Sequence, residues 1–326
     1  MSLLEIDGLH VELPGPDGGR RPVIHDVELH VDAGEAVGLV GESGSGKTMT
    51  LRSIVHLLPR GAVASGSVRF DGTDVLALKG AELRRWLASD VAVVFQDPRA
   101  HINPTRTIGD FLCEARVLVR GEKRGAAMAR AEALLDAVGI ADARRRLRQR
   151  PFELSGGMLQ RVMIAAALAA EPKLILADEP TTALDVTTQE EVMAILDELR
   201  RERGLAMVFV THDLELATAV CDRVAVMYAG RIVEDEPAAA LHACAAHPYT
   251  VALLAARPGL RAGGEPLATI EGRPISAFEA SDACAFAPRC PRAEAVCRVQ
   301  RPALRDVGGG AGRAACHFAE AQVVAT

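Results

Sequence analysis

Residues 41–48 read Gly41-Glu42-Ser43-Gly44-Ser45-Gly46-Lys47-Thr48, and they decide the fold of this 326-residue chain. Their spacing matches G-x-x-x-x-G-K-[ST], in which the glycines let successive backbone N–H groups face phosphate oxygens. The apolar stretch Ala36–Val40 predicts a buried strand before the loop, and Thr48–Leu58 predicts a helix after it. This order of strand, glycine loop and helix disfavours the alternative of a glycine-rich turn with a chance Lys-Thr pair.

The loop predicts a site for ATP and Mg²⁺. Lys47 is expected to bridge the β- and γ-phosphates and to act in catalysis, and Thr48 is expected to offer its hydroxyl to Mg²⁺. We expect the ATP-binding residues to be Gly41, Glu42, Ser43, Gly44, Ser45, Gly46, Lys47, Thr48 and Thr50.

Two acids follow a second apolar stretch, Leu174–Ala177, which predicts another buried strand. A carboxylate at the end of such a strand can reach Mg²⁺ through water, so we expect Asp178 to hold the metal. Glu179 is then expected to act as the general base that polarises the attacking water. Two solvated acids at the start of a loop are the alternative, and the phosphate loop makes that alternative weaker.

A third motif, Leu154–Gln160, contains the turn Ser155-Gly156-Gly157 directly before a predicted helix. Backbone N–H groups, a hydroxyl and a helix N-terminus together favour an anion. Ser155 can also simply cap the helix, and the two roles are compatible. Because the motif has no evident use on its own chain, we expect it to close over a nucleotide held by a neighbouring subunit.

Strands alternate with helices along most of the chain, which predicts a mostly parallel sheet covered on both faces. The further expected strands are Leu3–Asp7, Val27–Val31, Val68–Phe70, Val91–Phe95, Ala206–Val210 and Val224–Tyr228. Helical spacing of apolar residues predicts helices over Ile108–Val119, Ala126–Val138 and Gln189–Arg200.

Composition describes an ordinary globular protein, with 25% charged and 49% apolar residues. The net charge of −6 does not favour a general grip on nucleic acid. The first seven residues lack the basic start and apolar core of a secretory signal, and the longest apolar run, Val162–Ala170, is too short to span a membrane. We therefore expect a cytosolic protein, in which the seven cysteines are poor candidates for disulfides.

Together these motifs resemble the signature motif, Walker B motif and D-loop of ABC transporter ATPase subunits, in an order that matches from Leu3 to Glu234. The resemblance implies an α/β fold with a RecA-like P-loop NTPase core, a mostly parallel sheet and an antiparallel N-terminal β portion. It places the ATPase domain at residues 1–237, with a helical subdomain at about 97–164. It also implies a head-to-tail pair, in which each ATP contacts the other chain's signature residues Ser155, Gly156, Gly157 and Gln160.

The resemblance assigns three more residues. Gln96 matches the Q-loop glutamine, which binds Mg²⁺, senses the attacking water and links to the membrane partner; a surface glutamine is the alternative. His212 matches the switch histidine that contacts the γ-phosphate, although a lone histidine is more often a bland surface or core residue. Asp185 matches the D-loop aspartate that communicates across the dimer.

The finer resemblance is to ATPase subunits of dipeptide and oligopeptide importers, with nickel or other small-solute importers as the alternative. It rests on four stretches, which are Phe95–Pro98 with Asn103-Pro104, Gly157–Ala165, Ala177–Val186, and His247–Thr250 with Leu253-Leu254. The substrate class is implied by this resemblance alone, because the ATPase need not touch the peptide.

Residues 238–326 are expected to form a small C-terminal module with four cysteines spaced C-x5-C-x6-C-x18-C. Four thiols in a loop-rich segment can ligate a metal and so fold a segment without a large core. The spacing is longer than that of most structural Zn²⁺ sites, and the module resembles importer tails that hold a [4Fe–4S] cluster. We expect a cluster on Cys284, Cys290, Cys297 and Cys316, with Zn²⁺ or unligated thiols as alternatives. Cys113, Cys221 and Cys244 are expected to be free buried thiols.

The importer resemblance implies several partners: a paralogous ATPase subunit or a second copy of this chain, two transmembrane permease subunits and, indirectly, a substrate-binding protein. It places the protein on the cytoplasmic face of the inner membrane as a peripheral subunit, with no nucleic-acid partner. Soluble ABC ATPases that act on DNA or ribosomes are a weaker alternative. Their long coiled coils or their second cassette are not visible in this sequence.

Overall fold

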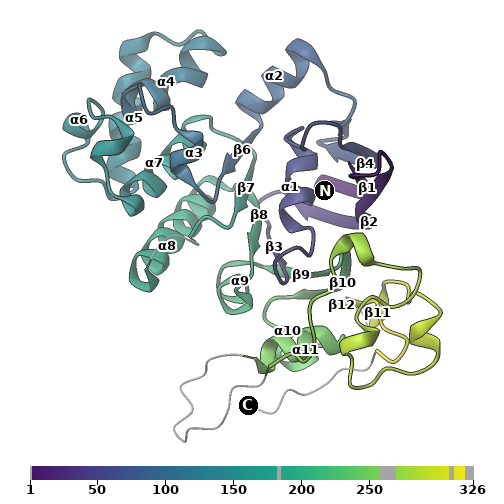
Figure 1. Cartoon of the computed structure of the whole chain (residues 1–326). Helices are drawn as coiled ribbons and strands as arrows, with labels where there is room; N and C mark the ends of the chain where they lie inside the picture. The colour runs from purple at the N-terminus through teal and green to yellow at the C-terminus, as the bar shows by residue number, and fades with distance from the viewer. Residues whose placement is uncertain (1, 182–184, 257–268, 308–311, 320–326) are drawn as a thin grey trace, which may run out of the picture. The chain divides into compact units, whose positions relative to one another are not determined.

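The computed structural model describes residues 2–181, 185–256, 269–307 and 312–319 (Figure 1). Residues 182–184 of the predicted D-loop motif and parts of the predicted C-terminal module lie outside the described residues. The chain divides into two compact units. Unit 1 contains residues 32–35 and 77–209, and unit 2 contains residues 2–31, 36–76 and 210–326.

Unit 1 holds most of the helices. They are α2 (Gly80–Ser89), α3 (Pro98–His101), α4 (Ile108–Leu118), α5 (Arg124–Ala137), α6 (Ala143–Arg146), the 3-10 turn Pro151–Glu153, α7 (Gly156–Ala169) and α8 (Val186–Arg203). The predicted helices at 108–119 and 126–138 are present as α4 and α5. A capping box begins α4, because the Thr107 hydroxyl accepts from the Asp110 N–H while the Asp110 carboxylate accepts from the Thr107 N–H.

The strands of unit 1 are β6 (Val91–Val94), β7 (Leu174–Asp178) and all but the last two residues of β8 (Ala206–Thr211). β7 lies between the other two. β6 and β7 run parallel, with Val91 opposite Leu174 and Val94 opposite Ala177. All five residues of β7 are buried, as the apolar stretch Leu174–Ala177 predicts for the first four. Parallel pairing brings the carboxyl ends of β6 and β7 to the same edge.

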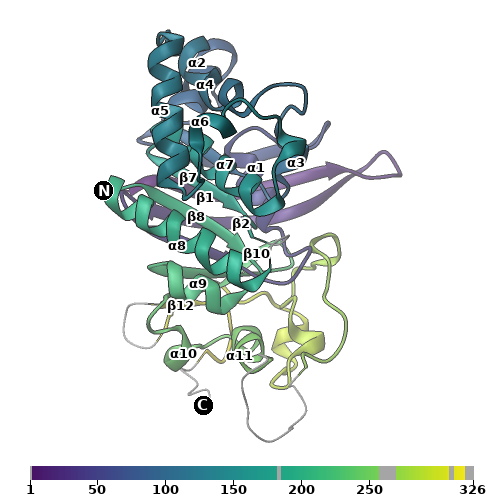
Figure 2. The same cartoon turned by 90° about the vertical axis from the view of Figure 1, so that its left-hand side faces the viewer.

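Unit 2 begins with a small sheet in the order β2-β1-β4-β5. Its strands are β1 (Ser2–Pro14), β2 (Arg20–Asp32), β4 (Val63–Phe70) and β5 (Thr73–Asp74), and Figure 2 shows β1 and β2 as a long hairpin. β1 pairs antiparallel with β4, as the predicted antiparallel N-terminal portion requires. Gly66 in β4 has φ of 97°, and a Cβ there would lie 2.2 Å from the Gly8 carbonyl oxygen, so only glycine fits.

The second group of strands in unit 2 comprises β3 (Ala36–Val40), β9 (Arg223–Tyr228), β10 (Arg231–Pro237), β11 (Arg305–Val307) and β12 (Gly312–Ala314). β3 and β9 pair in parallel, whereas β9, β10, β12 and β11 follow one another antiparallel. Helix α1 (Lys47–Ile54) follows β3 and ends four residues before the predicted end at Leu58. Helix α9 (Leu214–Val220) packs against β3 and β9.

The segment after Pro237 packs on this group of strands. Its described residues contain α10 (Leu241–Cys244), α11 (Pro248–Ala255) and three short 3-10 turns. Its core is an aromatic cluster of Tyr228, Tyr249 and Phe286, whose ring centroids lie 4.7–5.4 Å apart. β12 extends the strand group by pairing with β10, with Glu234 opposite Ala314. The domain boundary at residue 237 stays a prediction.

Candidate functional site: the phosphate loop and the acidic strand end

Lys47 is the first residue of α1, and its side chain folds back over the phosphate loop. The residue is only 4% exposed, and its Nζ donates to the carbonyl oxygens of Gly41 at 2.7 Å and Glu42 at 3.1 Å. The ammonium is therefore held against the backbone of the loop, where it can meet the oxygens of a phosphate. Thr48 follows in the same helical turn.

The glycines of the loop are required by close backbone approach. A Cβ on Gly41 would lie 2.2 Å from the Met227 carbonyl oxygen. Gly46 has φ of 110°, and a Cβ there would lie 2.7 Å from the Ile24 Cδ1. Larger residues at these two positions would push the loop away from β9 and β2.

The hydroxyl of Ser45 fits a phosphate ligand. Its Oγ is buried, and no described residue forms a hydrogen bond with it. A buried hydroxyl without a partner is unfavourable, so an anion in the loop would satisfy it. Ser43 and Gly44 are exposed at the tip of the loop. Thr50, in contrast, donates to the Gly46 carbonyl at 3.2 Å, and its predicted contact with ATP stays a prediction.

Glu42 ties the phosphate loop to the segment after Pro237. Its backbone N–H donates to the Tyr249 hydroxyl at 2.9 Å. Its carboxylate accepts two hydrogen bonds from Arg289, at 2.6 and 3.1 Å. The Arg289 side chain is only 3% exposed, and the bond to Glu42 raises the pKa of Arg289 above its ordinary value. Arg289 also donates to the Tyr228 hydroxyl at 3.4 Å.

Sequence reasoning missed Arg289 and Tyr249 as neighbours of the loop. Tyr249 lies in the quoted stretch His247–Thr250, which was a usable signal. Arg289 precedes Cys290, and nothing in its local sequence points to a partner 247 residues away.

The candidate catalytic acids lie in unit 1, at the end of β7. Asp178 is the last residue of the strand and is 4% exposed. Glu179 follows with a φ of 44°, a left-handed conformation that costs a non-glycine residue about 1–3 kcal/mol. The Gln96 Nε2 donates to the Glu179 Oε2 at 3.2 Å. The structure therefore brings together two residues predicted to handle the attacking water, because β6 and β7 end at the same edge.

The signature turn in unit 1 begins α7 as the capping pattern predicts. The Met158 N–H donates to the Ser155 Oγ at 3.3 Å, and both Ser155 and Gly156 are exposed. A Cβ on Gly157 would lie 2.9 Å from the Thr188 Cγ2, which explains a glycine there. Gln160 is different: it is 2% exposed and its Nε2 donates to the Phe95 carbonyl at 3.4 Å. Its predicted contact with a partner's nucleotide stays a prediction.

Asp185 and His212 occupy the starts of two helices. Asp185 caps α8, where its carboxylate accepts from the Thr188 N–H at 3.0 Å and from the Thr188 hydroxyl at 2.8 Å. The backbone hydrogen bond from Thr188 is the main cause that lowers the pKa of Asp185. His212 is exposed in unit 2, between β8 and the Asp213 cap of α9. The roles of both residues toward nucleotide stay predictions.

The four C-terminal cysteines line one small cavity of about 10 Å³. Burial raises the pKa of the Cys284, Cys290 and Cys316 thiols, and neighbouring thiols of the set add to each shift. Over the described ranges, however, no three His, Cys, Asp or Glu side chains form a group that could hold a metal ion. Four cysteine thiols are the ligands that an iron–sulfur cluster or Zn²⁺ uses. The positions of these four side chains, however, do not form a metal site.

Cys113 and Cys221 are buried, as predicted, whereas Cys244 is only partly buried; none of the three forms a disulfide within the described residues. Burial raises the pKa of Cys113. No helix within the described residues combines the length and apolar character needed to cross a membrane.

Two family profiles match the chain. The ABC transporter family matches residues 24–182, and the oligopeptide/dipeptide transporter C-terminal region matches residues 233–297. The chain is also 42% identical over 300 residues to the oligopeptide transport ATP-binding protein OppD of Salmonella typhimurium, which covers 92% of this chain and 89% of that relative. This chain belongs to the ATP-binding proteins of the ABC transporter family.

Further relatives agree with this assignment. The dipeptide transport ATP-binding protein DppD of Escherichia coli is 40% identical over 319 residues, covering 98% of this chain and 97% of DppD. Among solved structures, the ATP-binding cassette MJ0796, described as a post-hydrolysis dimer bound to ADP and Pi, gives a TM-score of 0.65 at 30% identity. The match covers 72% of this chain and 98% of the MJ0796 chain. The predicted α/β P-loop NTPase fold and ATPase activity are confirmed as properties of the family to which the chain belongs.

Proposed function

We propose that this chain is the ATP-hydrolysing subunit of an importer that takes up dipeptides or oligopeptides. The single observation that carries the substrate class is the match of residues 233–297 to the oligopeptide/dipeptide transporter C-terminal region. The names of OppD and DppD, which this chain resembles over nearly its whole length, support the same class.

The proposed reaction is phosphoryl transfer from ATP to water. Lys47 neutralises charge on the phosphates, and the Ser45 hydroxyl and loop N–H groups orient them. Mg²⁺, when bound, would be held by Thr48, Gln96 and Asp178 and would neutralise phosphate charge.

Glu179 takes the proton of the attacking water, and Gln96 holds the Glu179 carboxylate in place, as the 3.2 Å hydrogen bond between them supports. His212 is proposed to contact the γ-phosphate.

The working unit is proposed to be a head-to-tail pair of ATPase chains. The exposed Ser155 and Gly156, at the N-terminus of α7, would meet the nucleotide held by the other chain, and Asp185 would lie at the junction. The second chain is a paralogous subunit or another copy of this one. Two permease subunits would receive the motion of the pair at the cytoplasmic face of the membrane, and a substrate-binding protein would deliver the peptide.

We propose a [4Fe–4S] cluster, in preference to Zn²⁺, for Cys284, Cys290, Cys297 and Cys316. The convergence of the four thiols on one cavity supports a shared ligand. Because no three of these side chains form a metal-binding group as placed, the thiols must rearrange to hold either group. Anoxic purification with a visible spectrum and iron and zinc analysis tests this proposal. A colourless, metal-free protein with four titratable thiols in this segment would refute it.

The decisive experiment on the reaction is Glu179→Gln in the assembled transporter. We expect ATP binding and a trapped closed pair, with ATP turnover reduced by roughly 100-fold or more, which is the scale of a lost general base. Glu198→Gln is the control, because Glu198 is an exposed glutamate of α8 in the same unit. Wild-type turnover in Glu179→Gln would remove Glu179 from the mechanism.

Transport in proteoliposomes tests the substrate class. We expect ATP-dependent uptake of a labelled dipeptide or of a longer peptide, with Glu179→Gln as the inactive control. Uptake of Ni²⁺ without uptake of peptide would favour the nickel alternative and overturn the proposed substrate, while leaving the ATPase assignment intact.

A further inference from the structure

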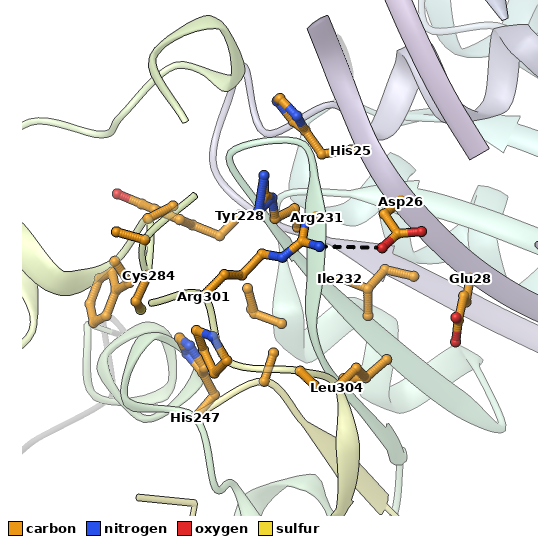
Figure 3. A pocket seen from close by; sticks show the side chains of 17 residues that line it. His25, Asp26, Glu28, Tyr228, Arg231, Ile232, His247, Cys284, Arg301 and Leu304 are labelled. Atoms are coloured by element: carbon orange, nitrogen blue, oxygen red, sulfur yellow. Dashed lines mark ion pairs between the residues drawn. The ribbon is translucent and has the colours of Figure 1, made fainter. Parts of the chain in front are cut away.

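A cavity of about 300 Å³ in unit 2 opens between β2, β10 and the C-terminal segment (Figure 3). None of its lining residues belongs to the phosphate loop or to the other residues predicted to bind ATP. Its volume lies at the lower end of the range for small-molecule sites, so it has room for a small organic ligand.

The interior of the cavity combines apolar side chains with the buried His25 and His247, and its mouth is charged. Tyr228 and Phe286 are each 1% exposed and Ile232 is 6% exposed. At the mouth, the side chains of Asp26 and Arg301 are 47% and 42% exposed. This arrangement suits a ligand with an apolar body and a polar end.

Arg231, at the start of β10, is the unusual residue in the lining. Its Nε and Nη1 are buried, and no residue in the described part of the chain accepts a hydrogen bond from either. Burial lowers the pKa of Arg231 below its ordinary value, and the nearby Arg301 cation acts in the same direction. A buried cationic donor without an acceptor is costly, because burial removes the water that would otherwise solvate it.

The acidic residues of the mouth face other arginines. The Oδ2 of Asp26 lies 3.5 Å from the Nη2 of Arg301, an ion pair drawn as the dashed line in Figure 3. The Oε2 of Glu28 lies 3.7 Å from the Nη1 of Arg313. Neither carboxylate supplies a hydrogen bond to the Nε or Nη1 of Arg231. The charges of Asp26 and Asp282 raise the pKa of Arg231, but no carboxylate of the described chain accepts a hydrogen bond from its Nε or Nη1. What these two donors lack is therefore an acceptor.

We propose that this cavity binds a small molecule with a carboxylate or phosphate group, which accepts hydrogen bonds from Arg231 while its apolar body rests on Tyr228, Ile232 and Phe286. The planar guanidinium holds its N–H donors in fixed directions and makes charge-assisted hydrogen bonds to such an oxyanion, whereas the ammonium of lysine is a rotatable point charge. The site is separate from the ATP site and independent of the transported substrate.

The test is a titration of the full chain, carrying ¹³C-methyl isoleucine, followed by NMR. Ile232 reports on the cavity, and Ile24, beside Gly46, reports on the phosphate loop. The probes are butyrate, butyramide and inorganic phosphate, up to about 100 mM, since so small a ligand can contribute only about 0.3–1.5 kcal/mol per heavy atom. Butyramide has the shape of butyrate without its charge.

We expect butyrate to shift the Ile232 signal saturably and butyramide to leave it unchanged. A saturable shift of Ile232 by phosphate, but not by butyrate, would assign the site to phosphate-bearing ligands. A shift of Ile24 alone would place phosphate in the loop and count against this cavity. If none of the probes moves Ile232 saturably, the proposal is wrong.

Arg231→Met separates binding from a structural role. We expect it to weaken the butyrate or phosphate titration at least 10-fold without lowering the melting temperature, because the guanidinium has unsatisfied donors in the unliganded chain. Arg231→Lys should weaken binding several-fold, because it keeps the positive charge but loses the planar guanidinium. This variant replaces Arg231→Met in the test if Arg231→Met does not fold. Arg273→Met, at an exposed arginine outside the cavity, is the control. Unchanged titration in both Arg231 variants would overturn the proposal.

Discussion

The phosphate loop and the cysteine-bearing segment, described over 269–307 and 312–319, both belong to unit 2, but they are built in different ways. The loop is organised mainly by its own short sequence, as the bonds from Lys47 to Gly41 and Glu42 illustrate. The cysteine-bearing segment has little regular structure and is anchored by distant residues, such as Tyr228 and Glu42. A motif can therefore be predicted from sequence when its contacts are local. The distant residues that hold the motif in place cannot be predicted in this way.

The largest effect should come from the loop itself. Lys47→Met removes the cation that faces the phosphates, so we expect ATP turnover by the assembled transporter to fall about 1,000-fold, with an unfolding free energy near that of the wild type. Lys79→Met, at an exposed lysine of unit 1, is the control. Comparable losses in both variants would show that the effect is not specific to the phosphate loop.

The next effect tests the anchoring of the cysteine-bearing segment. Phe286 is 1% exposed within the aromatic cluster, so Phe286→Ala should lower the free energy of unfolding by about 3–5 kcal/mol in urea denaturation. Phe278→Ala is the matched control, because Phe278 is 48% exposed and should change stability by no more than about 0.5 kcal/mol. Equal effects would mean that the segment does not depend on this cluster.

The link between the two regions is the pair of Glu42 and Arg289. A double-mutant cycle with Glu42→Gln and Arg289→Met should give a coupling of about 1–3 kcal/mol in unfolding free energy. This range allows for the partial exposure of Glu42, whose side chain is 25% exposed. We also expect Arg289→Met to raise the KM for ATP, since the N–H and carboxylate of Glu42 lose part of their support.

The exposed pair of Arg273 and Glu279, joined at 2.7 Å, serves as the control cycle and should show no measurable coupling. If both cycles give the same result, the phosphate loop does not depend on the cysteine-bearing segment.

The smallest effect concerns Glu236 in β10, which is 3% exposed. Burial, together with the nearby Glu234 and Asp235, raises the pKa of Glu236 to about 7 from an ordinary value of 4.5. Between these pH values the folded state binds more protons than the unfolded state, so stability falls as pH rises from about 4.5 to about 7 and stays lower above that.

Glu236→Gln removes this penalty. We expect the variant to be about 1–2 kcal/mol more stable than the wild type at pH 8, with the difference disappearing near pH 4.5. Thermal or urea unfolding across this pH range measures the change, and Glu5→Gln, at an exposed residue of β1, is the control. A difference that does not vary with pH would contradict the assigned protonation.

Several elements escaped sequence reasoning for identifiable reasons. Helix α2 carries a single buried residue, Trp86, so its apolar periodicity is weak. β11 and β12 have three residues each, too few for an alternating pattern. β12 pairs with β10, about 80 residues earlier, and β11 pairs with β12. The inward position of Gln160 follows from its contact with Phe95, which no local pattern reveals.

The amino-acid sequence by itself determined the phosphate loop, the acidic end of β7 and the helices α4 and α5, because short-range hydrogen bonding and apolar periodicity encode such features. The tertiary structure alone decided that Arg289 holds Glu42 across 247 residues and that Arg231 has buried donors without an acceptor from the described chain. It also gave Glu179 its left-handed backbone. These features depend on which surfaces pack against each other in the folded chain. The packing is determined by side chains from distant parts of the sequence that are buried together, and no single stretch of sequence determines it.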